Sequence, residues 1–332
     1  MIKKKTSARK WWLQIVGGIF LTFLIIFSVF MIISYRAFYS VPAVELPCRQ
    51  CTGQARAVHV NGFDLYYREL GTDIGHAPIV IIHGGPGHSS ESFKASLDFL
   101  AEDHHVIYYD QRGSGYSQIK PDTSLYTIDQ LVEELETIRK DVIGVDKIIL
   151  IAHSAGGALA QRYALANPEH VEIMILVSSI RINNGIGSPV IWDIFNPVFF
   201  VLGAGWPPAD PEAANQWFMP IMVNTSVPRL YNQSNRSILE NSGYISFATW
   251  REISRSMEGQ DFQDRLRKLQ TKTLIIYGVA DSAYTGETTA TMLHELLPDS
   301  TLVRFEKSGH WAFLEEPERF QQVVIDFLKS DH

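Results

Sequence analysis

The most continuous apolar run in the chain lies near its N-terminus, from Ile15 to Ser34, and it contains no charged residue. A helix of about twenty residues is ~30 Å long, which matches the hydrocarbon core of a bilayer. Basic residues precede the run, and Trp11 and Trp12 stand where an interface is expected. We therefore predict a membrane anchor over residues 15–34, with the N-terminus in the cytoplasm and the rest of the chain outside it. A cleaved signal peptide is disfavoured because its apolar region is normally about 7–15 residues long.

Beyond residue 56, short apolar runs alternate with segments of helical periodicity. Several runs, such as Pro78–Ile82, are apolar throughout, as expected for strands covered on both faces of a sheet. Thr127 and Gln130 fit a capping box at the start of a helix. This alternation predicts an α/β fold with a mostly parallel sheet and helices on both faces. The predicted strands are Ala57–Val60, Phe63–Leu70, Pro78–Ile82, Val106–Tyr109, Ile148–Ala152, Val171–Val177, Thr273–Tyr277 and Leu302–Phe305, and the predicted helices include Ser90–Asp103 and Thr288–Leu297.

The alternation stops between residues 180 and 270, where no clear strand run occurs and aromatic residues are frequent. We interpret this stretch as a mostly helical cap inserted into the α/β core, with most of the aromatic side chains forming the interior of the cap. The predicted division is a tail and anchor over residues 1–36, a linker over 37–56, a core built from 57–179 and 271–332, and a cap over 180–270.

The distribution of charge narrows the classes of partner. Six of the 29 Lys and Arg residues, and none of the 36 Asp and Glu residues, lie in residues 1–36, so the rest of the chain carries a formal charge of −13. An acidic body repels a phosphate backbone, and we expect no nucleic-acid partner. The 11 His residues lack the close pairing of a zinc site, so no metal is predicted. Cys48 and Cys51, the only cysteines, are expected to form a local disulfide or to remain idle thiols.

One junction between a predicted strand and a predicted helix singles out a serine. The run Ile148–Ala152 is followed by His153-Ser154-Ala155-Gly156 and then by a segment rich in Ala and Leu. A strand that reverses sharply into a helix lifts one side chain clear of the backbone and requires small neighbours. We predict that Ser154 occupies this turn and acts as a nucleophile. A plain serine at a helix start is the alternative for this residue taken alone.

A serine hydroxyl needs a base to accept its proton, and the base needs an acid to orient it. Such groups gather at the carboxyl ends of the strands in an open α/β sheet. Asp281 follows one late strand and His310 follows the last one. Their order along the chain, Ser then Asp then His, matches the order in α/β-hydrolases. We predict a catalytic triad of Ser154, Asp281 and His310.

Acyl transfer also requires donors for the oxyanion. The backbone N–H of Ala155, directly after the nucleophile, is one expected donor. The loop His83–Gly87 follows an early strand, and Gly85 is the best candidate for the other donor because glycine lets the backbone approach a substrate closely. This loop lacks the Lys-Ser/Thr pair of a phosphate-binding loop, and no cofactor is predicted.

Two motifs make the chain resemble a known family. His83–Gly87 reads HGGPG and Asp110–Ser117 reads DQRGSGYS, and both are marks of proline iminopeptidases within the α/β-hydrolase superfamily. The resemblance covers about residues 57–328. It implies an α/β-hydrolase fold with a helical cap, in which the first motif shapes the oxyanion side and the second packs beside the site.

The resemblance also implies a substrate. Proline iminopeptidases hold the free amine of the substrate with acidic cap residues, and Glu252 and Glu240 are the candidates here, with Glu252 the better one. Where the family usually has Gly-Gly-Ser-Trp-Gly, this chain has Ala152–Gly156 without the Trp. We expect a membrane-anchored serine hydrolase that forms an acyl-enzyme and releases N-terminal proline or similar residues from small peptides. A carboxylesterase or lipase acting on small or acyl-chain esters is the alternative, and a non-catalytic binding module on the same fold is a third.

Overall fold

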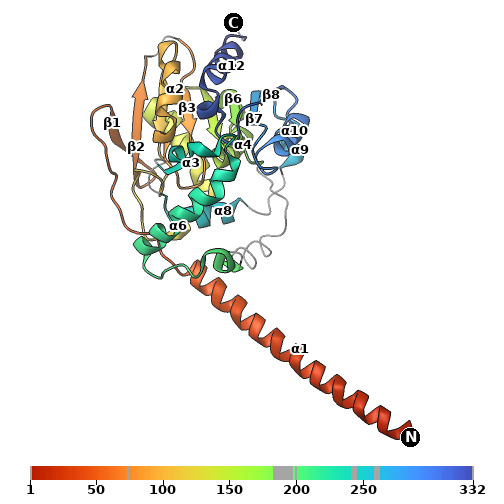
Figure 1. The fold of residues 1–332 in the computed structure, drawn as a ribbon. Helices are drawn as coiled ribbons and strands as arrows, with labels where there is room; N and C mark the ends of the chain where they lie inside the picture. Colours follow the sequence, from red (N-terminus) through yellow and green to blue (C-terminus); the bar gives the residue numbers. More distant parts are fainter. Residues whose placement is uncertain are drawn as a thin grey trace.

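A long N-terminal helix, α1 (Ile2–Tyr39), projects from the body of the protein, which the later elements form (Figure 1). The computed structural model describes residues 2–72, 75–181, 197–198, 200–240, 245–257 and 262–330. The body contains one eight-stranded sheet with helices packed on both faces. The predicted fold class is confirmed.

The sheet has the strand order β1-β2-β4-β3-β5-β6-β7-β8. β1 and β2 form an antiparallel hairpin, β2 pairs antiparallel with β4, and all later neighbours are parallel. The strands β3, β5 and β6 are buried almost throughout, as their apolar sequences require. The strand bounds are β1 (Ala55–Val60), β2 (Phe63–Leu70), β3 (Ile79–Ile82), β4 (Val106–Tyr109), β5 (Ile148–His153), β6 (Val171–Val177), β7 (Lys272–Gly278) and β8 (Ser300–Phe305).

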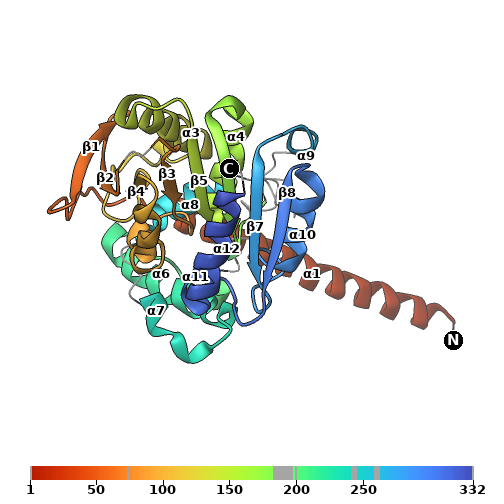
Figure 2. The same ribbon diagram turned by 90° about the horizontal axis from the view of Figure 1, so that it is seen from above.

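Two apolar cores lie on opposite faces of this sheet. Alternate side chains of β3 divide between them, with Val80 and Ile82 in one core and Ile79 and Ile81 in the other. Figure 2 shows α3 and α4 on one side of the sheet and α11 and α12 on the other. The helices that cover the sheet are α3 (Ile128–Thr137), α4 (Ala155–Ala166), α10 (Glu287–Leu296), α11 (Ala312–Glu315) and α12 (Pro317–Lys329).

Two predictions about helices have different outcomes. The capping box is confirmed, since the Thr127 side chain accepts from the Gln130 backbone and the Gln130 side chain accepts from Thr127. The continuous helix predicted over Ser90–Asp103 is wrong, because this segment consists of the 3₁₀ turn η1 (Ser90–Phe93), the single α-turn α2 (Lys94–Leu97) and the 3₁₀ turn η2 (Asp98–Glu102). Serine side chains in its first turn bond to Asp110 and to nearby backbone, which competes with regular helix formation.

The described residues between β6 and β7 form helices and turns that lie over the carboxyl ends of the central strands. Some of their apolar side chains form a cluster with Phe38 and Val41, in which Phe218, Phe247 and Trp250 pack against one another. The named helices of this region are α6 (Pro211–Ser226), α7 (Ser237–Glu240), α8 (Phe247–Ser256) and α9 (Gln263–Leu266).

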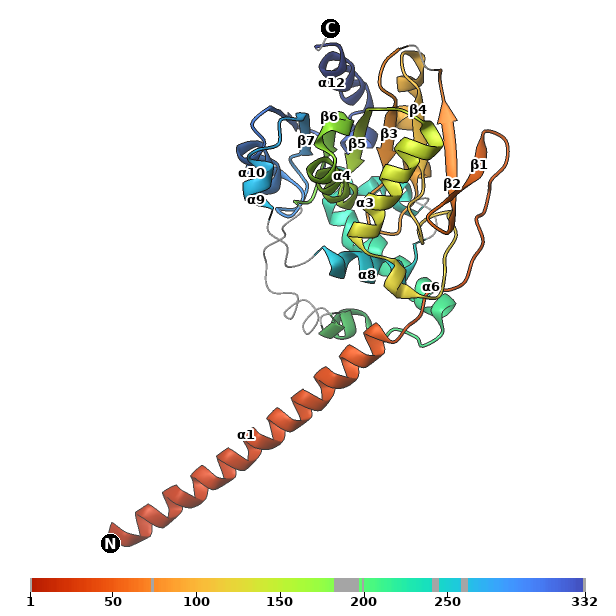
Figure 3. The same ribbon diagram turned by 180° about the vertical axis from the view of Figure 1, so that it is seen from behind.

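The segment Trp11–Tyr39 of α1 is long and apolar enough to cross a membrane by length and composition. A signal sequence near an N-terminus has the same two properties. Nearly all apolar side chains of this segment are exposed up to Val29, and the helix meets the body only near its C-terminal end (Figure 3). Cys48 and Cys51, just beyond α1, are both free thiols.

Candidate active site

Ser154 occupies a strained turn between β5 and α4. Its φ of 55° and ψ of −121° lie in a region that non-glycine residues rarely adopt. The backbone N–H of Ser154 donates to the Val177 carbonyl at 3.0 Å, which ties the turn to the neighbouring strand. Small residues are required here, since a Cβ on Gly156 would lie 2.5 Å from the His83 carbonyl oxygen. The turn predicted from the sequence is therefore present.

Asp281 and His310 meet at the ends of the neighbouring strands β7 and β8. Nδ1 of His310 lies 2.8 Å from Oδ2 of Asp281, and both side chains are buried. The other carboxylate oxygen, Oδ1, accepts the backbone N–H of Ser282 at 2.7 Å. A proton on Nδ1 directed at Asp281 leaves Nε2 of the ring as the acceptor. The pair thus has the geometry of an oriented base.

Ser154 and His310 line the same cavity. The described contacts of these two residues include no hydrogen bond between the serine Oγ and the imidazole. The link between nucleophile and base is commonly long before a substrate binds, and it tightens in the reacting complex. The structure therefore brings the three predicted residues to one site, with Asp281 and His310 in contact and Ser154 lining the same cavity as His310.

Arg229, on a turn of the cap, is a site residue that the sequence analysis did not identify. Its Nε donates to Oδ1 of Asp281 at 3.1 Å, and its Nη2 donates to Oγ1 of Thr285 at 2.7 Å. The same Nη2 lies 2.5 Å from Nδ1 of His310, and the Arg229 carbonyl accepts the backbone N–H of His310 at 2.8 Å. A guanidinium from the cap is thus fixed against the acid and base pair.

The loop after β3 forms the opposite wall of the site. Gly85 lines the cavity with a φ of +82°, and a Cβ there would lie 1.8 Å from the ring of His88. A Cβ on Gly84 would lie 2.8 Å from the Cβ of Ser154, so the loop passes directly beside the serine. Ala155 is the first residue of α4, where backbone N–H groups have no partner within the helix. The loop and the helix start can both present N–H groups to this space.

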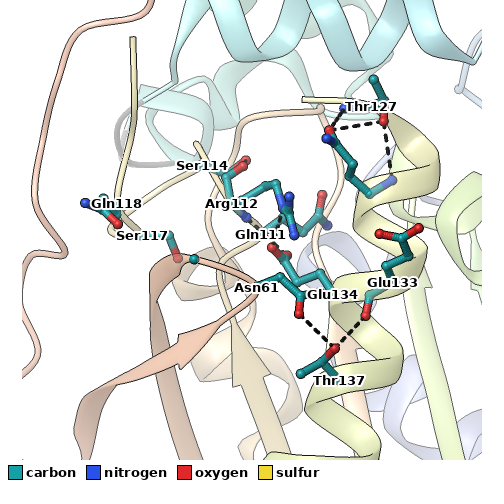
Figure 4. Close-up of polar contacts among 12 residues, drawn as sticks. Asn61, Gln111, Arg112, Ser114, Ser117, Gln118, Thr127, Glu133, Glu134 and Thr137 are labelled. Carbon is teal, nitrogen blue, oxygen red and sulfur yellow. Dashed lines mark hydrogen bonds and ion pairs between the residues drawn. The ribbon is translucent and has the colours of Figure 1, made fainter. Parts of the chain in front are cut away.

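The loop after β4 supports this wall. The backbone N–H of Gln111 donates to Nε2 of His83 at 3.0 Å, and its side-chain amide donates to the His83 carbonyl at 3.0 Å. The next residue, Arg112, is paired through Nε with Oε2 of Glu134 on α3 at 2.8 Å, with both side chains buried (Figure 4). The two sequence motifs therefore form one hydrogen-bonded unit, which positions the glycine loop.

The cavity has a volume of about 270 Å³ and lies between the sheet and the cap. Its polar groups include Glu91, the only acidic residue among the described residues that line it, whose Oε1 accepts the Tyr66 hydroxyl at 2.6 Å. Much of the remaining wall is apolar. The apolar lining residues are Phe93, Met222, Val223, Leu239, Ile245, Trp311 and Leu314.

A family model described as the alpha/beta hydrolase fold matches residues 77–317, a range that includes Ser154, Asp281 and His310. The chain belongs to the α/β-hydrolase family. The recognition made from the two sequence motifs is confirmed at this level.

Curated relatives of this α/β-hydrolase are proline iminopeptidases. The enzyme of Heyndrickxia coagulans is 30% identical over 294 residues, which cover 82% of this chain and 98% of the relative. The enzyme of Saccharolobus solfataricus is 29% identical over 287 residues, which cover 80% of this chain and 89% of the relative. The protein is thus a hydrolase of the prolyl aminopeptidase-like kind.

Solved structures that share the fold have other activities in their descriptions. A thermophilic esterase from Thermogutta terrifontis aligns with a TM-score of 0.68 at 22% identity, covering 84% of this chain and all of the esterase. The enol-lactonase from Burkholderia xenovorans aligns with a TM-score of 0.66 at 20% identity, covering 82% of this chain and 99% of the lactonase. At these identities the likeness establishes the fold alone.

Of the two glutamates predicted to hold an amine, the structure places one elsewhere. Glu252 of the hydrolase is not among the residues that line the cavity, and its Oε1 accepts from Nε of the buried Arg251 at 2.8 Å. Glu240 ends α7, and its side chain lies outside the described part of the structure. Glu91, which the sequence pattern did not distinguish, is an acidic residue that the fold brings to the cavity.

The imidazoles around the cavity are held neutral. Burial lowers the pKa of His310; Asp281 raises it and Arg229 lowers it further, which leaves a pKa of about 4. Desolvation lowers the pKa of His88 to about 3, and burial holds the pKa of His153 well below its usual value. Burial alone would raise the pKa of Asp281, but His310 and Arg229 outweigh it and hold the carboxyl pKa well below its usual range. At neutral pH His310 is therefore neutral and Asp281 is ionised.

Proposed function

We propose that this protein is a membrane-anchored serine hydrolase in which Ser154 is the nucleophile, His310 the general base and Asp281 the group that orients the base. The observation that carries the proposal is the 2.8 Å contact between His310 and Asp281 beside a serine in a strained strand-to-helix turn. The backbone N–H groups of Gly85 and Ala155 are the proposed donors to the oxyanion. Each group lies at the carboxyl end of a strand, where parallel sheets collect their functional residues.

In the proposed reaction, the oxygen of Ser154 bonds to the substrate carbonyl carbon while its proton moves to Nε2 of His310. The tetrahedral oxyanion accepts hydrogen bonds from the two backbone donors. As the carbon–nitrogen or carbon–oxygen bond breaks, His310 returns the proton to the leaving group, and an acyl-enzyme remains. Water then attacks the ester carbon and gives a proton to His310. As the bond between that carbon and the Ser154 oxygen breaks, His310 returns the proton to this oxygen, which releases the acid and regenerates Ser154.

We propose N-terminal proline, or a similar residue with a free amine, as the acyl part of the substrate. Support comes from the curated proline iminopeptidases. It also comes from Glu91, a carboxylate in the cavity that can accept hydrogen bonds from a protonated amine. Glu252 was the sequence-based candidate for this role, and its contact with Arg251 makes it the natural comparison.

The substrate proposal is tested by comparing proline β-naphthylamide with the N-acetylated compound, whose amine is blocked. We expect turnover of the first only, and we expect Glu91→Gln to raise KM for it about tenfold or more through loss of a charge-assisted contact. Glu252→Gln is the matched control and should leave this KM within about twofold. Equal turnover of the free and blocked compounds would overturn the aminopeptidase proposal.

A carboxylesterase is the second candidate, and the apolar cavity wall favours it. Ala155 stands where the related peptidases usually carry Trp, which leaves room beside the serine for an acyl chain. p-Nitrophenyl esters of increasing chain length measure this activity in the same assay. If the octanoate exceeds proline β-naphthylamide in kcat/KM by 100-fold or more (roughly 3 kcal/mol), the esterase assignment replaces the peptidase one.

Arg229 should control the acid limit of activity. His310 must be neutral to accept a proton, so kcat/KM should fall on acidification with the pKa of His310, about 4. Replacing Arg229 by Met removes a positive charge beside the imidazole, which favours the protonated ring and should raise this pKa by about one unit. Arg229→Lys keeps the charge and is the control. If kcat/KM of the Met variant falls at the same pH as that of the wild type, the guanidinium does not act on His310.

We propose that residues 15–34 cross the membrane, with residues 1–36 forming the tail and anchor, the N-terminus in the cytoplasm and the catalytic body outside it. The apolar helix and the basic residues that precede it support this topology. The proposed division of the body is a core of residues 57–179 and 271–332 and a cap over 180–270, joined to the anchor through residues 37–56.

A further inference from the structure

The C-terminal end of α1 is built into the cap. Phe38 and Val41 are fully buried, and the Phe38 ring lies 5.1 Å from that of Phe247 on α8. The buried Arg251 donates through Nη1 to the carbonyl oxygens of Phe38 at 2.6 Å and Val41 at 3.0 Å. These carbonyls lie at the helix C-terminus, where the backbone lacks partners within the helix. The direction of α1 is therefore fixed relative to the cap.

A second part of the cap lies beside α1 closer to its N-terminus. The ring of Trp206 lies 5.8 Å from that of Phe30. Phe30 precedes Phe38 by two turns, which is about 12 Å along the helix axis. Figures 1 and 3 both show the green cap segment that precedes α6 next to this end of α1. The cap thus extends along the outer end of the apolar helix.

The depth of the contact between Trp206 and Phe30 in the bilayer follows from the length of the membrane-crossing part of α1. If Trp11 and Trp12 mark the inner interface, a hydrocarbon core of ~30 Å is crossed by about twenty residues and ends near Ile33. Phe30 then lies just inside the outer boundary of the hydrocarbon. Trp206, which contacts it, lies at the level where tryptophan is enriched in membrane proteins.

The side chains of the cap segment around Trp206 are suited to a position at the membrane interface. Leu202 is 71% exposed and Trp206 is 43% exposed. The sequence from Ile194 to Ala209 contains no charged residue. Exposed apolar side chains that continue the surface of an apolar helix are typical of contact with a lipid interface.

We propose that residues 200–206, together with the outer end of α1, form one lipid-contacting surface, so that the cap rests in the outer interface of the bilayer. The inference depends on the membrane anchor of the proposed function. It goes beyond that function by assigning a lipid contact to the cap itself.

This surface is connected to the cavity through α6. The indole N–H of Trp217 on α6 donates to the Ala204 carbonyl at 3.0 Å. Farther along the same helix, Met222, Val223 and Ser226 line the cavity. The helix of 16 residues is about 24 Å long. Trp217 lies near the middle of this helix, and Met222 follows it by about 7.5 Å along the helix axis. α6 therefore connects the proposed lipid surface to the wall of the cavity.

The test uses the full-length chain in phosphatidylcholine vesicles, with Cys48 and Cys51 replaced by Ser. Single cysteines at Leu202, at Ile25 in α1 or at Lys268 on the body are labelled with an environment-sensitive fluorophore. Quenching by a nitroxide-bearing lipid is then compared with quenching by aqueous iodide. Each labelled chain is first required to retain ester hydrolysis, and Trp206→Cys serves as a second position on the cap.

We expect the lipid nitroxide to quench the label at Leu202 and at Ile25, and iodide alone to quench the label at Lys268. If Ile25 is quenched from the lipid while Leu202 and Trp206 behave like Lys268, the cap does not touch the bilayer and the inference fails, although the anchor stands. If Ile25 is also quenched only by iodide, the anchor itself is wrong, and the inference falls with it.

Discussion

Ser154→Ala is expected to lower kcat by about 10⁶-fold on any substrate the enzyme turns over, because it removes the atom that bonds to the carbonyl. The fold should persist, since the turn depends on the backbone bond from Ser154 to Val177 and on the small residues beside it. Because alanine keeps the Cβ and the serine side chain makes no cap hydrogen bond, thermal stability should stay within about 1 kcal/mol of wild type.

The measurement is steady-state hydrolysis of p-nitrophenyl acetate and proline β-naphthylamide, with thermal unfolding recorded on the same samples. Ser124→Ala, an exposed serine far from the cavity, is the matched control and should retain full activity. A loss of less than 100-fold in the Ser154 variant, with the fold intact, would mean that another group performs the attack.

Asp281→Asn should lower kcat by about 10⁴-fold. The amide cannot stabilise a protonated His310, and it can orient the ring in the wrong tautomer. It would also leave the Arg229 guanidinium beside the imidazole without its carboxylate partner. Both effects disfavour the imidazolium that forms during the reaction.

The matched control is Asp264→Asn on the exposed surface, which should change kcat by less than twofold. The kcat of both variants is compared at pH 5, 7 and 9. If Asp281→Asn retains a tenth or more of the activity at pH 7, the buried contact with His310 is structural and the proposed triad is incomplete.

Much of the core follows from local patterns in the sequence. The wholly apolar runs around Ile148–Ala152 predict buried strands, and the structure places them at the centre of the sheet. The small residues around Ser154 predict a sharp turn, and its positive φ matches that prediction. Asp281 and His310 stand directly after strands, so the register of a parallel sheet brings them together.

The residues that the sequence did not predict are joined by contacts between distant parts of the chain. Arg229 donates to Asp281 across 52 residues and lies against His310 across 81, and it follows a proline in a segment with no strand or helix periodicity. Glu91 reaches the cavity because Ser89 and Ser90 bond to Asp110, which breaks the helix that the pattern favours. No local spacing marks such residues, since the packing of separate elements decides their position.

In the cap, too, contacts between distant residues decide positions that the sequence pattern does not predict. Glu252 lies in the region where an amine-binding acid was expected, but the buried Arg251 next to it needs a carboxylate partner, and Glu252 supplies it. Arg251 in turn satisfies the end of α1, 210 residues away along the chain. The helix end that the sequence assigned to a linker is therefore part of the interior of the cap.

The most direct test of the proposed nucleophile is covalent labelling with a fluorophosphonate, followed by mass spectrometry of the digested protein. We predict a single adduct on the peptide that contains Ser154 in the wild-type chain, and no adduct on that peptide in Ser154→Ala. The Asp281→Asn variant should react with the fluorophosphonate more slowly than the wild-type chain does. Undiminished labelling of the Ser154→Ala protein, or an adduct on a different residue, would contradict the assignment of Ser154.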